Sequence, residues 1–132
     1  MKIADILEAY PAQRRLIDAS LASLGLTEVA AVVARGERYR PGQVAVACDK
    51  ALAYVSLDAQ TLQASVHVYP WQQVPVPALD VTATLLMERV ELAMHLTLAD
   101  PEIEVRASER ADIAALVAFW AACLTSGPSA CR

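Results

Sequence analysis

The chain has 132 residues and a formal net charge of −4, and this length fits a single domain, 1–132, with a sizeable core. An acidic chain lacks the positive surface that phosphate backbones require, which disfavours a nucleic-acid partner. Asp5 and Glu8 lie where a signal peptide would be apolar, and the longest apolar run, 113–125, is too short for a membrane span. We therefore expect a cytoplasmic protein without a membrane span.

An N-terminal helical segment is predicted over 2–25, where apolar residues recur at helical spacing. Pro11 removes a backbone donor and should separate two helices or kink one. Gly25 stands where a left-handed residue commonly ends a helix. The apolar stripe of these helices would pack on the chain's own sheet or on a neighbouring subunit.

About seven short strands follow, because apolar and polar residues alternate in runs bounded by turn residues. The segment Arg35–Gly42 is expected to be a polar connection with a turn at Pro41-Gly42. Short turns between consecutive strands imply antiparallel pairing. The predicted strands are 28–34, 43–48, 51–57, 62–69, 81–87, 90–98 and a last strand around 102–106.

A C-terminal helix is predicted to begin after Ser108 as N-cap and to end before Gly127-Pro128, with 126–132 as a flexible tail. One apolar stripe is expected to pack on the sheet. It consists of Ile113, Leu116, Val117, Trp120 and Leu124. The fold class is therefore α+β: N-terminal helices, then about seven antiparallel strands in a sandwich or open barrel, capped by one C-terminal helix.

Three segments within 28–125 resemble a bacterial pleckstrin-homology-like (PH-like) domain. Arg35-Gly36-Glu37 resembles the "GE" before the second strand, the hairpin 44–55 is similar to the family's strand–"T-D-x-R-L"–strand unit, and 68–74 looks like its "I-P-Y-x-x-I" segment. Cys48 and Ala51 depart from that pattern. The resemblance implies a seven-stranded sheet capped by one helix, and it implies no single function.

No catalytic apparatus is recognisable, and we expect no enzyme, no cofactor and no metal site. The three cysteines, Cys48, Cys123 and Cys131, lack the spacing of a disulfide framework or a zinc site. His67 and His95 are interpreted as exposed strand residues. A glycine-rich phosphate loop and a nucleophile elbow are both missing.

The first candidate binding site is basic. Arg35, Arg38 and Arg40 would lie on the first inter-strand loop, with Lys50 on a nearby turn. Because arginine can hold phosphate bidentately, this cluster would suit a phosphorylated headgroup or an acidic peptide. The alternative is an ordinary solvated loop, since neighbouring acids partly neutralise it.

The second candidate is aromatic. Tyr69 and Trp71 precede the segment Val74–Pro77 at a strand end, where aromatic and proline residues can form a protein-binding edge. The alternative is that Trp71 closes one end of the core.

The leading functional hypothesis is a non-catalytic protein-interaction or self-assembly module, whose partner is another protein or a second copy. A ligand carrier is the first alternative, with an apolar pocket between sheet and terminal helix. Small alanines would leave room for that pocket: Ala114, Ala115, Ala118, Ala121 and Ala122. An enzyme of unfamiliar type is the second alternative, and it would need His67 or His95 to converge with a carboxylate in a cleft.

Overall fold

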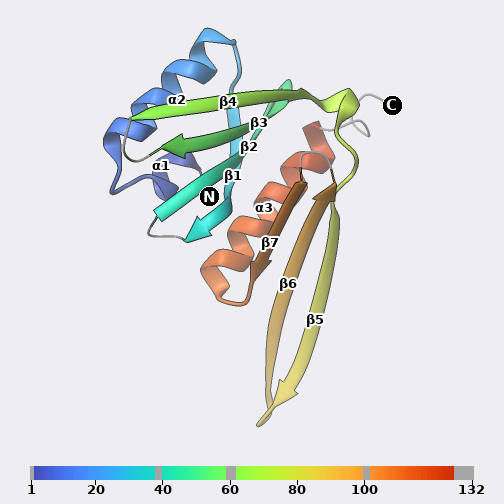
Figure 1. Cartoon of the computed structure of the whole chain (residues 1–132). Helices are drawn as coiled ribbons and strands as arrows, with labels where there is room; N and C mark the ends of the chain where they lie inside the picture. Colours follow the sequence, from blue (N-terminus) through green and yellow to red (C-terminus); the bar gives the residue numbers. More distant parts are fainter. Residues whose placement is uncertain (1, 38–39, 59–61, 100–101, 127–132) are drawn as a thin grey trace.

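The computed structural model describes residues 2–37, 40–58, 62–99 and 102–126 (Figure 1). It confirms the α+β class, with seven antiparallel strands in two sheets, short N-terminal helices and a C-terminal helix. The helices are α1 (Ile3–Ile6), α2 (Pro11–Ser23), the 3-10 turn η1 (Trp71–Gln73) and α3 (Arg110–Ser126). The strands are β1 (Glu28–Glu37), β2 (Arg40–Cys48), β3 (Ala51–Asp58), β4 (Gln63–Pro70), β5 (Ala78–Leu86), β6 (Arg89–Ala99) and β7 (Glu102–Ala107).

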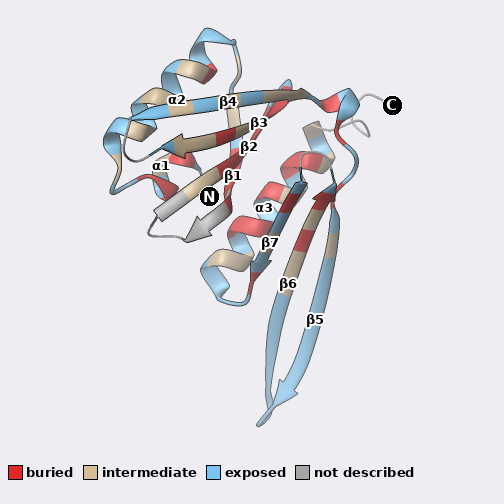
Figure 2. Ribbon diagram, in the orientation of Figure 1, coloured by how far each residue is buried: buried red, intermediate tan, exposed pale blue. Residues whose placement is uncertain are grey.

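The first sheet, in the order β1-β2-β3-β4, is covered on both faces. Successive side chains of a strand point to opposite faces. Val44 and Val46 pack against α1 and α2, whereas Ala45 and Ala47 belong to a second cluster with α3 and the sheet β5-β6-β7. The molecule therefore has an open-sandwich arrangement with apolar clusters on either side of the first sheet (Figure 2).

The N-terminal helices pack on the chain's own sheet. Ile3, Ile17 and Leu21 are buried together with the β2 and β3 side chains that face them. Pro11 occupies the first position of α2, where its missing N–H is not needed, so the predicted break between two helices is confirmed. Gly25 has a φ of 68°, as expected for the residue that follows a helix end.

The β1–β2 hairpin differs from the sequence prediction at Arg35–Gly42. Both strands continue through most of this segment, and Gly36 pairs with Pro41 while Glu37 pairs with Arg40. Pro41 is tolerated because β2 pairs with β3 only from Gln43 onward, so no ladder bond is required of it on that side. The predicted turn at Pro41-Gly42 is therefore wrong, because both residues belong to β2, and residues 38–39 lie outside the described residues.

The buried face of α3 is centred on Phe119, which is fully buried. Leu116 lies on this face as predicted, and Ile113 and Trp120 lie beside it, but Val117 points to solvent. The buried face of α3 is therefore rotated about the helix axis relative to the predicted stripe. Nearly all α3 positions are apolar, so hydrophobic periodicity does not distinguish the inner face from the outer one.

Candidate functional site

The predicted basic cluster is spread over the two ends of β2. Arg35 and Arg40 have their backbones in β1 and β2, and Arg38 lies outside the described residues. Lys50 is exposed in the turn between β2 and β3. At about 3.3 Å per strand residue, β2 from Arg40 to Cys48 is roughly 26 Å long, and Lys50 lies beyond its far end. Lys50 therefore does not join the arginines on one loop.

The two predicted aromatic residues are held against the core. Trp71 is 5% exposed, and its indole Nε1 donates a 2.9 Å hydrogen bond to the carbonyl oxygen of Cys48. Tyr69 is half-buried, and its ring stacks on the exposed His67 at a centroid distance of 4.3 Å. This placement matches the alternative in which Trp71 closes one end of the core.

The titratable groups of the described chain include one histidine–carboxylate pair, His95 and Glu104, which is solvent-accessible on the neighbouring strands β6 and β7. His95 Nε2 lies 3.0 Å from Glu104 Oε1, and hydrogen bonds from Arg106 and His95 hold the pKa of the exposed Glu104 below its usual range. Burial raises the pKa of both Cys48 and Cys123 to about 12, so neither thiol ionises near neutral pH. Within the described ranges, no group of three or more His, Cys, Asp and Glu side chains could hold a metal ion.

The hairpin of β5 and β6 extends beyond the rest of the fold (Figure 1). Its register pairs Val81 with Met94 and Leu86 with Arg89, but β7 pairs with β6 only from Met94 to Ala99. The outer part, residues 81–93, is therefore a two-stranded ribbon, about 20 Å long at the usual rise per residue. We call this ribbon the arm.

One face of the arm is apolar throughout. Leu85 pairs with Val90 and Ala83 with Leu92, and the same face continues along β6 to the buried Leu96. Beyond Met94 none of the described residues covers it: Val81 is 53% exposed, Leu85 72% and Val90 66%. Figure 2 shows the arm exposed along its whole length. The opposite face is more polar, with Thr82, Thr84, Arg89 and Glu91.

The tip of the arm has an unusual backbone. Met87 and Glu88 have φ values of 49° and 65°, as in a type I′ hairpin turn, where asparagine and glycine are preferred. Met87 is also the most exposed apolar side chain described, at 94%. A bulky apolar residue thus occupies a left-handed position in the turn of the arm.

A second exposed apolar surface lies on α3. This surface, the outer stripe, faces away from both sheets and consists of Ala111, Ala114, Val117, Ala118 and Ala121. Of the five alanines expected to leave room for a pocket, only Ala115 and Ala122 face the core. A helix that is apolar on all sides is typical of one that is buried on all sides.

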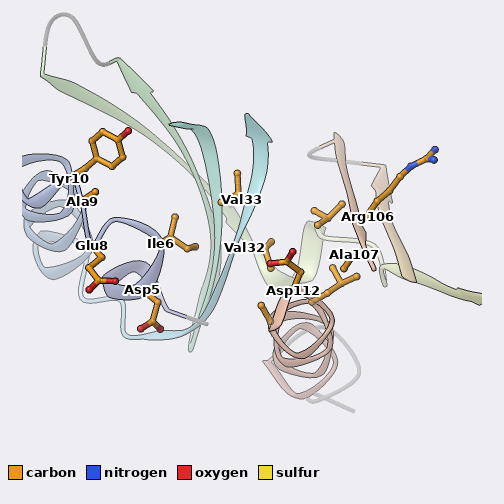
Figure 3. Close-up of a pocket in the computed structure, with 13 residues that line it drawn as sticks. Asp5, Ile6, Glu8, Ala9, Tyr10, Val32, Val33, Arg106, Ala107 and Asp112 are labelled. Atoms are coloured by element: carbon orange, nitrogen blue, oxygen red, sulfur yellow. The ribbon is translucent and has the colours of Figure 1, made fainter. Parts of the chain in front are cut away.

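A cleft of about 350 Å³ opens between α1, β1, β7 and α3 (Figure 3). Val32 and Leu116 contribute to its floor, and the carboxyl-bearing residues Asp5, Glu8 and Asp112 lie around it. In Figure 3 the Arg106 side chain extends away from these carboxylates. The cleft therefore has an apolar floor and an acidic rim.

The sequence contained one signal for the arm. In the alternation of 90–98, Leu96 and Leu98 are buried, whereas Val90 and Leu92 on the same face are exposed, because the pattern is the same whether or not another layer covers that face. The predicted strand 81–87 includes the tip residues Leu85–Met87 and does not indicate that they are exposed.

Comparison of the chain with protein-family profiles, with curated proteins and with solved structures found no match.

Proposed function

We propose that this chain is a non-catalytic protein-interaction module of the PH-like type, and that it contacts its protein partner through the arm. The observation that carries the proposal is the uncovered apolar face of Val81, Leu85, Val90 and Leu92. Monomeric proteins seldom expose a contiguous apolar patch beyond about 300–600 Å² unless it serves binding.

The arm's construction supports the same reading. A two-stranded ribbon is marginally stable in water unless a third strand or another layer packs on it. β5 also forms the open edge of its sheet, with Asp80 as its only charged residue and no proline within Leu79–Leu86. Natural edge strands usually carry charges or proline that prevent pairing with other chains. The unprotected edge of β5 therefore favours an interface that another protein covers.

The PH-like assignment is supported by topology. The resemblance implies seven strands and one capping helix, and the chain has seven antiparallel strands followed by a C-terminal helix. Because one fold can host many functions, the functional proposal rests on the arm rather than on the fold.

Site-specific photo-crosslinking tests the proposal. A photoreactive side chain replaces Leu85 on the apolar face or, as matched control, Thr82 on the opposite face, and the cells that make the protein are irradiated. We expect protein adducts from position 85 and few from position 82. Lipid adducts alone, or no adducts at position 85, would contradict an interaction module that works through the arm.

A second candidate function, small-ligand binding, is favoured by the cleft. Its volume falls within the range of ligand sites, about 300–1,000 Å³, and its acidic rim would suit a cationic molecule with an apolar body. Native mass spectrometry of the purified chain would reveal a retained small molecule. That extra mass should disappear when Val33→Trp fills the cleft, and a bare chain would remove this candidate.

A further inference from the structure

The arm and the outer stripe of α3 are two unexplained apolar surfaces on one chain. We propose that they cover each other between two copies: the arm of one copy packs on the outer stripe of the other, and the same contact forms a second time by two-fold symmetry. This inference rests on the proposed function and identifies the partner as a second copy of this chain.

The arm cannot cover the stripe of its own chain. The arm's apolar face continues the face of β6 on which the inner side of α3 packs, through Leu96, Leu98 and Phe119. The outer stripe is on the opposite side of the same helix. A ribbon fixed to the sheet would have to pass around α3 to reach it, so only another copy can supply the covering arm.

The side chains of the two surfaces differ in size, and the two sets are complementary. The arm presents the bulky Val81, Leu85 and Val90, whereas four of the five stripe residues are alanine. Large side chains of a sheet packing on a flat helix surface leave few voids, as close packing of an interface requires. Two arms stacked face to face would instead oppose bulky side chains and leave both stripes uncovered.

The exchange would cover both surfaces of each copy at once. A standard interface takes about 800 Å² from each partner, so a dimer needs both surfaces. Either surface alone would supply much less. A reciprocal contact is isologous, so it closes after two copies and leaves no apolar surface to recruit a third.

The charges permit this contact. From Ala111 to Ala121 the only charged residue of α3 is Asp112, which lies off the outer stripe. On the arm, Arg89 and Glu91 lie on the face opposite the apolar one. Arg110 is four residues before Ala114 and continues the stripe at its N-terminal end, where its exposed position leaves it in solvent. Packing the arm between Ala111 and Ala121 therefore buries no unpaired charge.

Complementation between two variants tests the exchange. Leu85→Lys damages the arm, and Ala118→Glu damages the stripe, so each variant alone loses both contacts of its homodimer. In an equimolar mixture, the heterodimer keeps one intact contact, formed by the undamaged arm and the undamaged stripe. Its other contact sets the new lysine against the new glutamate.

We expect a dimer for the native chain by analytical ultracentrifugation. Each variant alone should associate at least about 30-fold more weakly, the loss expected for one central interface residue. Mixing should restore a heterodimer, which native mass spectrometry identifies because the two variants differ in mass. Thr82→Lys on the polar face and the nearly isosteric Ala118→Ser are the matched controls, and both should remain dimeric. Circular dichroism of each variant checks that it is folded.

Four results would overturn the exchange. Weakening by Leu85→Lys but not by Ala118→Glu, without rescue on mixing, would indicate contact between two arms. A native chain that is monomeric, including one that binds lipid vesicles through the arm, would exclude a second copy as partner. Crosslinks from position 85 to a different protein would remove the exchange while the proposed function stands, whereas no protein crosslink at all would remove both.

Discussion

The carboxyl group of Glu28 is half-buried between α1 and the first sheet, where it accepts a hydrogen bond from the backbone N–H of Ile3. Burial raises the pKa of Glu28, and this effect outweighs the opposing influence of that hydrogen bond and of Lys2. The group therefore binds its proton more tightly in the folded state than in the unfolded chain. Its contribution to stability is largest at low pH and falls as pH rises above 4.5.

Replacing Glu28 with Gln tests the predicted direction in which stability changes with pH. The amide oxygen can still accept the bond from Ile3, but the side chain no longer ionises. We expect the variant to gain stability relative to the native chain as pH rises from 4 to 7 in urea unfolding. Glu104→Gln is the control of opposite sign. The pKa of Glu104 is lowered in the folded state, so its ionised carboxylate stabilises the fold at pH values above 4.5. Because Glu104 is exposed, its replacement should change the free energy of unfolding only slightly. A relative gain by the native chain would show that the hydrogen bond dominates over burial.

The arm tip gives a second prediction for single residues. Glu88→Gly places the residue that most readily adopts positive φ at a position where φ is 65°. Relief of about 1 kcal/mol of local strain should slow amide hydrogen exchange in the arm roughly fivefold. Glu91→Gly, in the middle of β6, is the control and should accelerate exchange. Equal exchange in native chain and Glu88→Gly would mean that the tip carries no strain.

At the level of secondary-structure elements, most of the fold could be predicted because strand alternation and chain breakers have direct physical causes. Pro11 and Pro70 interrupt backbone hydrogen bonding, and they lie where α2 begins and β4 ends. Glu102, Glu104 and Arg106 are on the exposed face of β7 as expected. These predictions needed only local rules.

Three features could not be predicted because they depend on what packs against each element. Pro41-Gly42 has the composition of a turn, yet cross-strand pairing extends the hairpin past it. The buried face of α3 centres on Phe119, which an apolar stripe through Val117 missed. For the candidate site, the distance between Lys50 and Arg40 is set by the full length of β2.

A pair of substitutions tests the orientation of α3. Phe119→Ala removes a fully buried ring and should lower the free energy of unfolding by about 3–5 kcal/mol. Val117→Ala, on the outer stripe, should lower it by less than about 1 kcal/mol when measured on dilute monomer. Chemical denaturation of both variants provides the comparison, and a larger loss at Val117 would mean that the opposite face of the helix is buried.

At the scale of the whole molecule, we expect that the arm can be deleted without unfolding the core. Replacing Ala83–Leu92 with Asn-Gly joins Thr82 to Ala93 by a two-residue turn that suits a hairpin. The shortened chain should stay folded, because every residue of the two apolar clusters remains. It should also be monomeric if the arm forms the interface.

The midpoint temperature of thermal unfolding, Tm, should depend on protein concentration in the native chain but not in the shortened chain. Association stabilises the folded state by mass action, so Tm of the native chain should rise with protein concentration. Tm of the shortened chain should stay constant across the same range. A shortened chain that fails to fold would show instead that the arm stabilises its own core, and a concentration-independent Tm in the native chain would argue against assembly.

The period of two along a strand restricts how the arm can change in evolution. Loss of one cross-strand pair, one residue from each strand, would turn every side chain beyond the deletion to the opposite face, so that Leu85 and Val90 would exchange places with polar neighbours. Loss or gain of two pairs preserves the apolar face. Related chains with arms of different length should therefore differ by four residues or a multiple of four, and an alignment in which the arm varies by two would show that the orientation of this face is not under selection.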